Sequence, residues 1–205
     1  MRERIAASTR LRIALLVVLW VTVPTLAGGD ETAAVRNCTW CHGTSAEGFA
    51  TAPRLAGQRP QYVMNQLLDF RRHTRDNPFS RQFMWGAAEN LTAWTAHDLA
   101  SYFATISPQA ANDGNPELAG AGRTIYEEGN PESNIVACGA CHGPNAEGVG
   151  EIPRLGGLSY SYLKRRLEQW GEGYHAAARP PMPRIASKLG PNEIDALASY
   201  LSFVK

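Results

Sequence analysis

The chain carries one six-residue pattern twice, and this repetition limits the possible folds more than any other feature of the sequence. The first copy, "CTWCHG", spans residues 38–43, and the second copy, "CGACHG", spans residues 138–143. At the same offset of 100 residues, both copies are followed by "AEG" and then by "PRL". Similarity at a fixed spacing indicates two copies of one structural unit. We therefore expect two tandem modules with the same fold.

Helical periodicity continues the match beyond the two motifs. Apolar and aromatic residues recur at spacings of four and three residues, which places three of each set on one face of a helix. The two sets are Tyr62, Val63, Leu67 and Phe70, and Tyr162, Leu163, Leu167 and Trp170. An offset of 98 then aligns "LASYF" at 99–103 with "LASYL" at 197–201. These last segments are typical of amphipathic helices, and we expect their N-caps at Thr95 and Asn192.

The N-terminus has the organisation of a secretory signal peptide. Four arginines and one glutamate precede an apolar run from Ile13 to Val23, and small residues follow near Ala27. The run is shorter than the roughly 20 residues that a membrane-spanning helix needs, although an uncleaved anchor is the alternative. We expect residues 1–27 to be removed and the protein to be periplasmic. The mature chain then has a net charge of about −2, which does not suit nucleic-acid binding.

A cysteine pair followed by a histidine suits zinc, a disulfide or a haem. A structural zinc site usually takes two cysteine pairs within about 20 residues, but these pairs are 100 residues apart. A redox disulfide usually accompanies a βαβ unit, which a helical pattern does not provide. C-x-x-C-H is the attachment signature of c-type haem, because two sulfur atoms on one helical turn can reach both vinyl groups. We predict two covalent haem c groups, attached at Cys38, Cys41, Cys138 and Cys141.

The residue after each second cysteine is the expected axial ligand of the haem iron, namely His42 or His142. A methionine thioether on the opposite side is typical of electron carriers and raises the reduction potential. Met84 lies 42 residues after His42, and Met182 lies 40 residues after His142, at equivalent positions in the repeat. We predict these methionines as the opposite ligands, with core packing as the alternative use of each.

Three further histidines lie outside the motifs. His73 and His175 occur in the variable segments ahead of the two methionines, so they are the alternative iron ligands. His97 lies early in a predicted helix, where we expect an exposed side chain.

The mature chain divides into a first domain at 28–106, a linker at 107–120 and a second domain at 121–205. The linker, "SPQAANDGNPELAG", is rich in Pro, Gly, Asn and Ala and has no periodicity. The second domain has room for a helix before its motif, whereas the first has barely two turns before Cys38. We predict an all-α fold of two tandem cytochrome c-like domains, each wrapped around one covalent haem.

These motifs resemble the dihaem cytochrome c4 family, in which two cytochrome c domains follow one another. The resemblance covers nearly the whole mature chain, including "PRLAGQ", "QLLDF" and "LASYF". It implies that Pro53 and Pro153 offer their carbonyl oxygens to the ligating histidines and so orient the rings. It also implies that the propionate edges of the two haems meet at the domain interface. Arg54 and Arg154 are then either propionate ligands or surface residues.

The resemblance implies an electron carrier rather than an enzyme. Its partners would be redox proteins, such as a respiratory complex, an oxidase or a dehydrogenase, with at most a loose membrane association and no small-molecule substrate. The alternative is a cytochrome subunit of a periplasmic dehydrogenase, such as a flavocytochrome c sulfide dehydrogenase. Catalysis at the haem, as in dihaem peroxidases, is less expected because it needs an open sixth position on the iron.

Overall fold

The computed structural model describes residues 28–174 and 181–205. The predicted signal peptide and His175 lie outside these residues. The first half contains α1 (Gly28–His42), α2 (Pro60–Arg71), the π-helical turn η1 (Ser80–Met84), α3 (Trp85–Ala88) and α4 (Ala93–Thr105). The second half contains α5 (Pro116–Glu128), α6 (Gly139–His142), α7 (Tyr160–Gly171), α8 (Met182–Ala186) and α9 (Pro191–Phe203). Across the described residues, β-structure is limited to isolated bridges, so the predicted all-α fold is confirmed.

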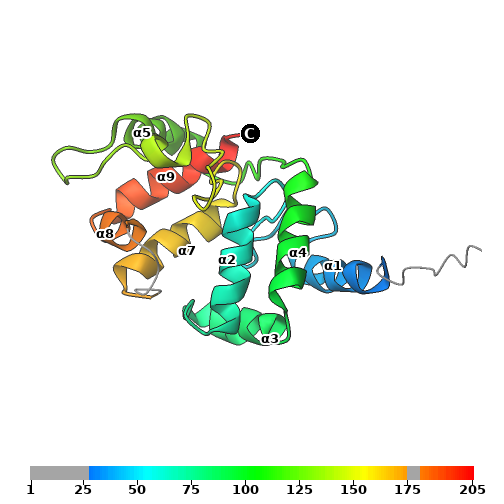
Figure 1. Cartoon of the computed structure of the whole chain (residues 1–205). Coiled ribbons are helices and arrows are strands. Elements are labelled where there is room, and N and C mark those ends of the chain that lie inside the picture. Colours follow the sequence, from blue (N-terminus) through cyan, green and yellow to red (C-terminus); the bar gives the residue numbers. More distant parts are fainter. Residues whose placement is uncertain (1–27, 175–180) are drawn as a thin grey trace, which may run out of the picture.

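The helices form two modules that lie side by side (Figure 1). In the first module α2 packs against α4, and in the second α7 packs against α9, its counterpart in the repeat. Each module has its own hydrophobic core. The first core consists of Ala46, Ala56, Leu99 and Phe103, and the second of Tyr126, Ala146, Leu158, Tyr162, Leu163, Leu197, Ala198 and Leu201. The two-module arrangement is therefore the one that the repeat predicts.

The last helix of each module begins earlier than the sequence suggested. Thr92 is the N-cap of α4, because its hydroxyl accepts a hydrogen bond from the backbone N–H of Thr95 at 3.0 Å. The N-cap of α9 is Gly190, whose N–H donates to the Glu193 carboxylate at 2.8 Å. The predicted caps at Thr95 and Asn192 were therefore wrong, since both residues lie inside the first helical turn.

The two modules differ in the segment that leads into the haem motif. In the first, α1 runs without a break into the motif and ends at His42. In the second, α5 is followed by a loop and then by the short α6. α5 begins at Pro116, inside the segment predicted as a linker, and packs closely across α9. The second module therefore has a crossing helix ahead of its motif, whereas α1 forms part of the motif itself.

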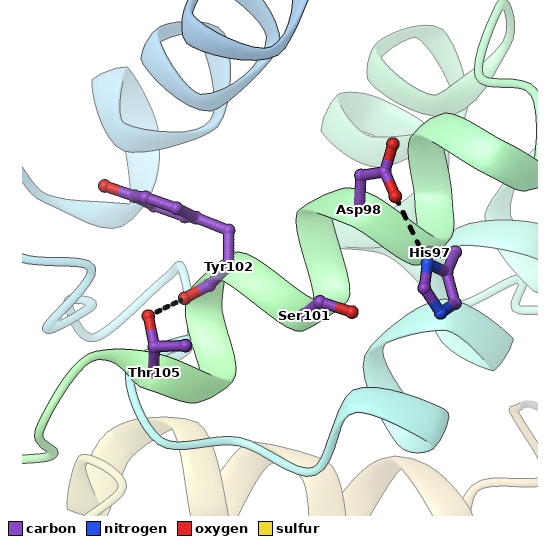
Figure 2. Close-up of a pocket in the computed structure, with 5 residues that line it drawn as sticks. All are labelled: His97, Asp98, Ser101, Tyr102 and Thr105. Carbon is purple, nitrogen blue, oxygen red and sulfur yellow. Dashed lines mark hydrogen bonds and ion pairs between the residues drawn. The ribbon is translucent and has the colours of Figure 1, made fainter.

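The face of α4 that corresponds to the α5-covered face of α9 is open. Asp98, Ser101 and Tyr102 of α4 correspond to Ala196, Ser199 and Tyr200 of α9. Figure 2 shows the three α4 side chains together with His97 and Thr105, which line a shallow hollow. In the second module, α5 and the residues just before it occupy this place. Among residues 28–174 and 181–205, no helix of the first module takes the place of α5 at this hollow. His97 is exposed, as predicted.

Hydrogen bonds to backbone groups join the two modules. The Gln58 amide donates to the carbonyl oxygen of Arg154 at 2.9 Å and accepts from its N–H at 2.8 Å. The guanidinium of Arg54 donates to the carbonyl oxygens of Gly156 and Gly157. Arg54 is only 5% exposed, so it is an interface residue rather than a surface residue.

Candidate haem-attachment sites

In the first module the attachment motif forms the last turn of α1. Cys38 is half-buried and packs against the first core, whereas Cys41 is exposed. Burial, followed by the nearby Cys41, raises the pKa of the Cys38 thiol to about 11. Both cysteines are free thiols that lie one helical turn apart.

The second module builds the same arrangement on a shorter helix. Cys138 immediately precedes α6 and packs against the second core, and Cys141 is exposed. Burial raises the pKa of the Cys138 thiol to about 11. A thiol with a raised pKa is a poor nucleophile for disulfide exchange, so both sites disfavour the redox-disulfide alternative.

A side-chain to backbone hydrogen bond fixes the histidine of each motif. Nδ1 of His42 lies 2.7 Å from the carbonyl oxygen of Pro53. In the second module, Nδ1 of His142 lies 2.9 Å from the carbonyl oxygen of Pro153. A carbonyl oxygen only accepts, so Nδ1 carries the proton and Nε2 keeps its lone pair. Burial is the main cause that lowers the pKa of both rings, which favours their neutral form. A neutral imidazole is the form that coordinates a metal.

Met84 and Met182 are held by different local structures. Met84 is the last residue of η1, and Met182 is the first residue of α8. Both side chains are half-buried. A single π-helical turn is rare and often occurs at a functional site. The structure thus places each methionine in the segment between the α2 or α7 helix and the last helix of its module, and their assignment as iron ligands stays a prediction.

His73, the alternative ligand in the first module, takes part in a different contact. Its backbone has a φ of 60°, and its ring stacks on Trp85 with the ring centroids 3.9 Å apart. The residue is exposed.

In the described part of the chain, no three His, Cys, Asp or Glu side chains form a group that could hold a metal ion.

Four buried nitrogen atoms have no hydrogen-bond partner in the described structure. They are Arg54 Nε, Arg75 Nε, Asn77 Nδ2 and Trp170 Nε1. All four are N–H donors, and a buried donor without an acceptor costs about 1–3 kcal/mol. A haem group provides carboxylate oxygens that can accept such bonds, so the residues present fit this cofactor. The sequence did not indicate Arg75 and Asn77 as candidate site residues. The two copies of the repeat differ in length between residues 71 and 84, so neither residue had a matching position.

The protein has an all-α fold of two modules, and each module carries one attachment motif with a proline-bound histidine. These features define it as a c-type cytochrome. The family model "Cytochrome c" matches residues 119–205. Cytochrome c4 of Thiocapsa roseopersicina is 36% identical over 170 residues, which are 80% of this chain and 85% of that relative. The structure of Acidithiobacillus ferrooxidans cytochrome c4 matches with a TM-score of 0.76 at 30% identity, over 82% of this chain and 98% of that one. The chain therefore belongs to the cytochrome c4 family.

A second kind of relative also matches most of the chain. The thiosulfate dehydrogenase electron acceptor of Stutzerimonas stutzeri (strain A1501) is 36% identical over 182 residues, which are 86% of this chain and 82% of the relative. Family membership makes this chain an electron-transfer protein with two haem c groups, as the sequence predicts, and its partners are redox proteins. Within residues 28–174 and 181–205, each helix is too short or too polar to span a lipid bilayer.

Proposed function

We propose that both haem irons are six-coordinate, with His42 and Met84 as axial ligands in the first module and His142 and Met182 in the second. The covalent attachment points are Cys38, Cys41, Cys138 and Cys141, and the residues that orient the histidines are Pro53 and Pro153. The repeated bond from histidine Nδ1 to a proline carbonyl carries this proposal, because it leaves Nε2 as the coordinating nitrogen in both modules.

A bound haem supplies one-electron redox chemistry. The chain's own residues hold the ring through two thioether positions, fix the imidazole by a hydrogen bond and surround it with apolar side chains. With histidine and methionine on opposite sides, the iron has no open position for a substrate. The function that this arrangement supports best is electron transfer between two other redox proteins.

Two measurements test the cofactor and its ligands. The mass of the mature chain after acid–acetone extraction should include two haem groups, because thioether bonds survive that treatment. The oxidised protein should show a far-red methionine-to-iron charge-transfer band with the intensity of two haems. A bare polypeptide mass would contradict the attachment sites, and a band of one-haem intensity would contradict one of the methionine ligands.

We further infer that the mature protein acts in the periplasm, with cleavage after Ala27 and domains at 28–106 and 121–205. The arginines before a short apolar run support this location. Mass analysis of the periplasmic fraction should find a chain that begins at Gly28. An intact N-terminus in a salt-washed membrane fraction would instead identify residues 1–27 as an anchor, and release from membranes by salt alone would indicate a loose association.

The name of one relative favours a particular kind of electron donor. We propose that a periplasmic dehydrogenase of the thiosulfate-oxidising class reduces this cytochrome, because a chain of similar length and 36% identity is an electron acceptor of thiosulfate dehydrogenase. Mixing the oxidised cytochrome with such a dehydrogenase and thiosulfate should reduce both haems at a rate that saturates with cytochrome concentration. Reduction no faster than that of an unrelated cytochrome of similar potential would exclude this donor.

A further inference from the structure

Arg165 of the second module contacts two segments of the first module. The residue belongs to α7 (Figure 1). Its guanidinium donates to the carbonyl oxygen of Thr51 at 3.3 Å. The guanidinium carbon also lies 4.5 Å from the centre of the Phe79 ring. One side chain of the second module therefore joins two separate parts of the first.

These two segments lead to the proposed axial ligands of the first haem iron. Thr51 lies two residues before Pro53, whose carbonyl oxygen is 2.7 Å from Nδ1 of His42. Phe79 is the N-cap of η1, and Met84 is the last residue of that turn. The contacts of Arg165 thus reach the support of the histidine ligand on one side and the support of the methionine ligand on the other.

Phe79 is connected to Met84 through the π-helical turn. The turn begins at Ser80, directly after Phe79, and the backbone N–H of Trp85 donates to the Ser80 carbonyl oxygen. The Phe79 ring stacks on the Phe83 ring, with the ring centroids 6.1 Å apart. Phe83 is the residue before Met84. A contact that holds Phe79 in place therefore also restrains the residue next to the methionine.

The surroundings of Arg165 strengthen its contact with the Phe79 ring. The residue is half-buried, and burial is the main cause that lowers the pKa of its guanidinium. A cation over an aromatic ring gains more energy where water is partly excluded. The guanidinium carbon also lies 5.7 Å from the centre of the Tyr162 ring. Arg165 therefore contacts one aromatic ring of each module.

The repeat does not duplicate this cation. The residue of the first module that corresponds to Arg165 is Asn65, on α2. Its Oδ1 accepts a hydrogen bond from the Gln61 side chain of the same helix at 3.1 Å. The first module thus builds the equivalent helix with a neutral residue at this position. The helix itself does not require an arginine, so the contacts with the other module are the better explanation of Arg165.

We propose that Arg165 is a positioning residue that the second module supplies to the first haem site. It holds the segment that ends at Met84 through the Phe79 ring, and the segment that leads to Pro53 through the Thr51 carbonyl oxygen. The inference rests on the axial ligands of the proposed function. Its consequence is that the second module keeps the sixth position of the first iron closed to external ligands.

Competition by added imidazole measures how firmly Met84 is held. In the oxidised holoprotein, imidazole displaces a methionine ligand and removes the far-red band of that haem. Met84→Ala and Met182→Ala each remove one half of the band, so they assign the two steps of the titration. Arg165→Gln should raise the apparent affinity of the first haem for imidazole by about 5-fold to 10-fold, because a partly desolvated cation–π contact is lost. The affinity of the second haem should not change.

Three further variants separate the contact from the charge. Phe79→Leu removes the aromatic ring but keeps an apolar side chain, so it should raise the same affinity by a similar factor. The double variant with Arg165→Gln should add little to either change, because both remove one contact. Arg165→Lys keeps the charge without the forked donor geometry and should have a smaller effect. The matched control is Arg123→Gln, which removes an exposed charge from the same module and should change neither haem.

Covalent haem content and helical circular dichroism identify any variant that fails to fold, and Phe79→Leu and Arg165→Lys then carry the test. With the first-haem band intact, an unchanged imidazole affinity in Arg165→Gln and Phe79→Leu would overturn the positioning role. An equal rise at both haems would also overturn it, because the contact reaches only the first site. A first-haem band that is missing from the unchanged protein would instead contradict the Met84 ligand of the proposed function, and this inference would fall with it.

Discussion

Gly122 lies so close to Ala196 that a Cβ atom added to the glycine would be 2.0 Å from the alanine carbonyl oxygen. The same atom would also be 2.8 Å from the Cβ of Tyr200. The glycine therefore allows the backbones of α5 and α9 to approach each other directly. This contact closes the second module on the side where the first module has its open hollow.

Gly122→Ala should destabilise the second module, because the added methyl group meets rigid backbone and forces the two helices apart. Overpacking of this kind costs about 1–3 kcal/mol. The matched control is Gly120→Ala on the same helix, where an added Cβ meets nothing within 4 Å. The control should stabilise the helix by about 0.5–1 kcal/mol. Denaturant unfolding followed by circular dichroism would measure both changes, and equal effects at the two positions would contradict the role of the close contact.

The start of α4 gives a second prediction about stability. Thr92→Ala removes the hydroxyl that accepts from the Thr95 N–H, and N-cap losses of this kind cost about 1 kcal/mol. Thr95→Ala should cost less, because the Thr95 hydroxyl accepts from no N–H of the helix start and the Thr92 cap remains. Thermal unfolding of the two holoprotein variants compares them directly. A larger loss for Thr95→Ala would mean that the capping role had been assigned to the wrong threonine.

The sequence predicted those features that depend on local spacing. Apolar residues at helical spacing correctly predicted the α2, α4, α7 and α9 helices. Cysteines at i and i+3 with a following histidine predict the two attachment sites. Both copies of a repeat must satisfy the same local rules, so each supported the other. The N-cap of α4 was misplaced because Thr92 and Thr95 are equally good capping residues, and only the backbone conformation distinguishes them. The N-cap of α9 was misplaced because Gly190 has no capping side chain, so it gave no signal beside Asn192.

Features that depend on contacts between the modules were not predictable in this way. Arg75 lies in the segment where the two copies differ in length, so no counterpart marked it. Its guanidinium donates to the Tyr162 hydroxyl of the second module, a contact that no pattern within one module specifies. Arg54 shows the same limit, because its carbonyl partners are more than 100 residues away in the chain. Contacts of this kind become visible only when the two modules are placed together.

The axial methionines give a prediction about redox chemistry. Met84→Ala and Met182→Ala should each lower the reduction potential of one haem, because the thioether favours ferrous iron. Axial ligands tune haem potentials over a range of about 0.8 V, so a change on the order of 100 mV is expected. A redox titration of each variant would resolve the two haems, and the untouched haem should stay nearly unchanged.

His73→Ala is the control for the first module. In the proposed site His73 is not an iron ligand, and its ring stacks on Trp85. It should leave both potentials close to their original values. If this change moved a potential as far as Met84→Ala does, then the histidine and not the methionine would be the iron ligand.

The last prediction concerns the first module, which has the smaller core. Its cluster contains four buried residues, two of them alanines, whereas the cluster of the second module contains eight. The open face of α4 adds no further apolar burial. In a domain of about 80 residues a single hydrophobic core supplies only a few kcal/mol, so a small core leaves the domain marginally stable. A haem packed against Leu55, Leu67 and the α4 face that carries Leu99 and Phe103 would supply the missing core. Haem attachment and folding should therefore occur together.

Cys38→Ala combined with Cys41→Ala should therefore unfold residues 31–105 and leave the second haem and its far-red band intact. The reciprocal change at Cys138 and Cys141 should spare the first module. Limited proteolysis with mass mapping measures this directly, because the unfolded module is cut first. A compact, protease-resistant first module without its haem would show that the polypeptide alone fills this core, and the coupling of haem attachment to folding would have to be abandoned.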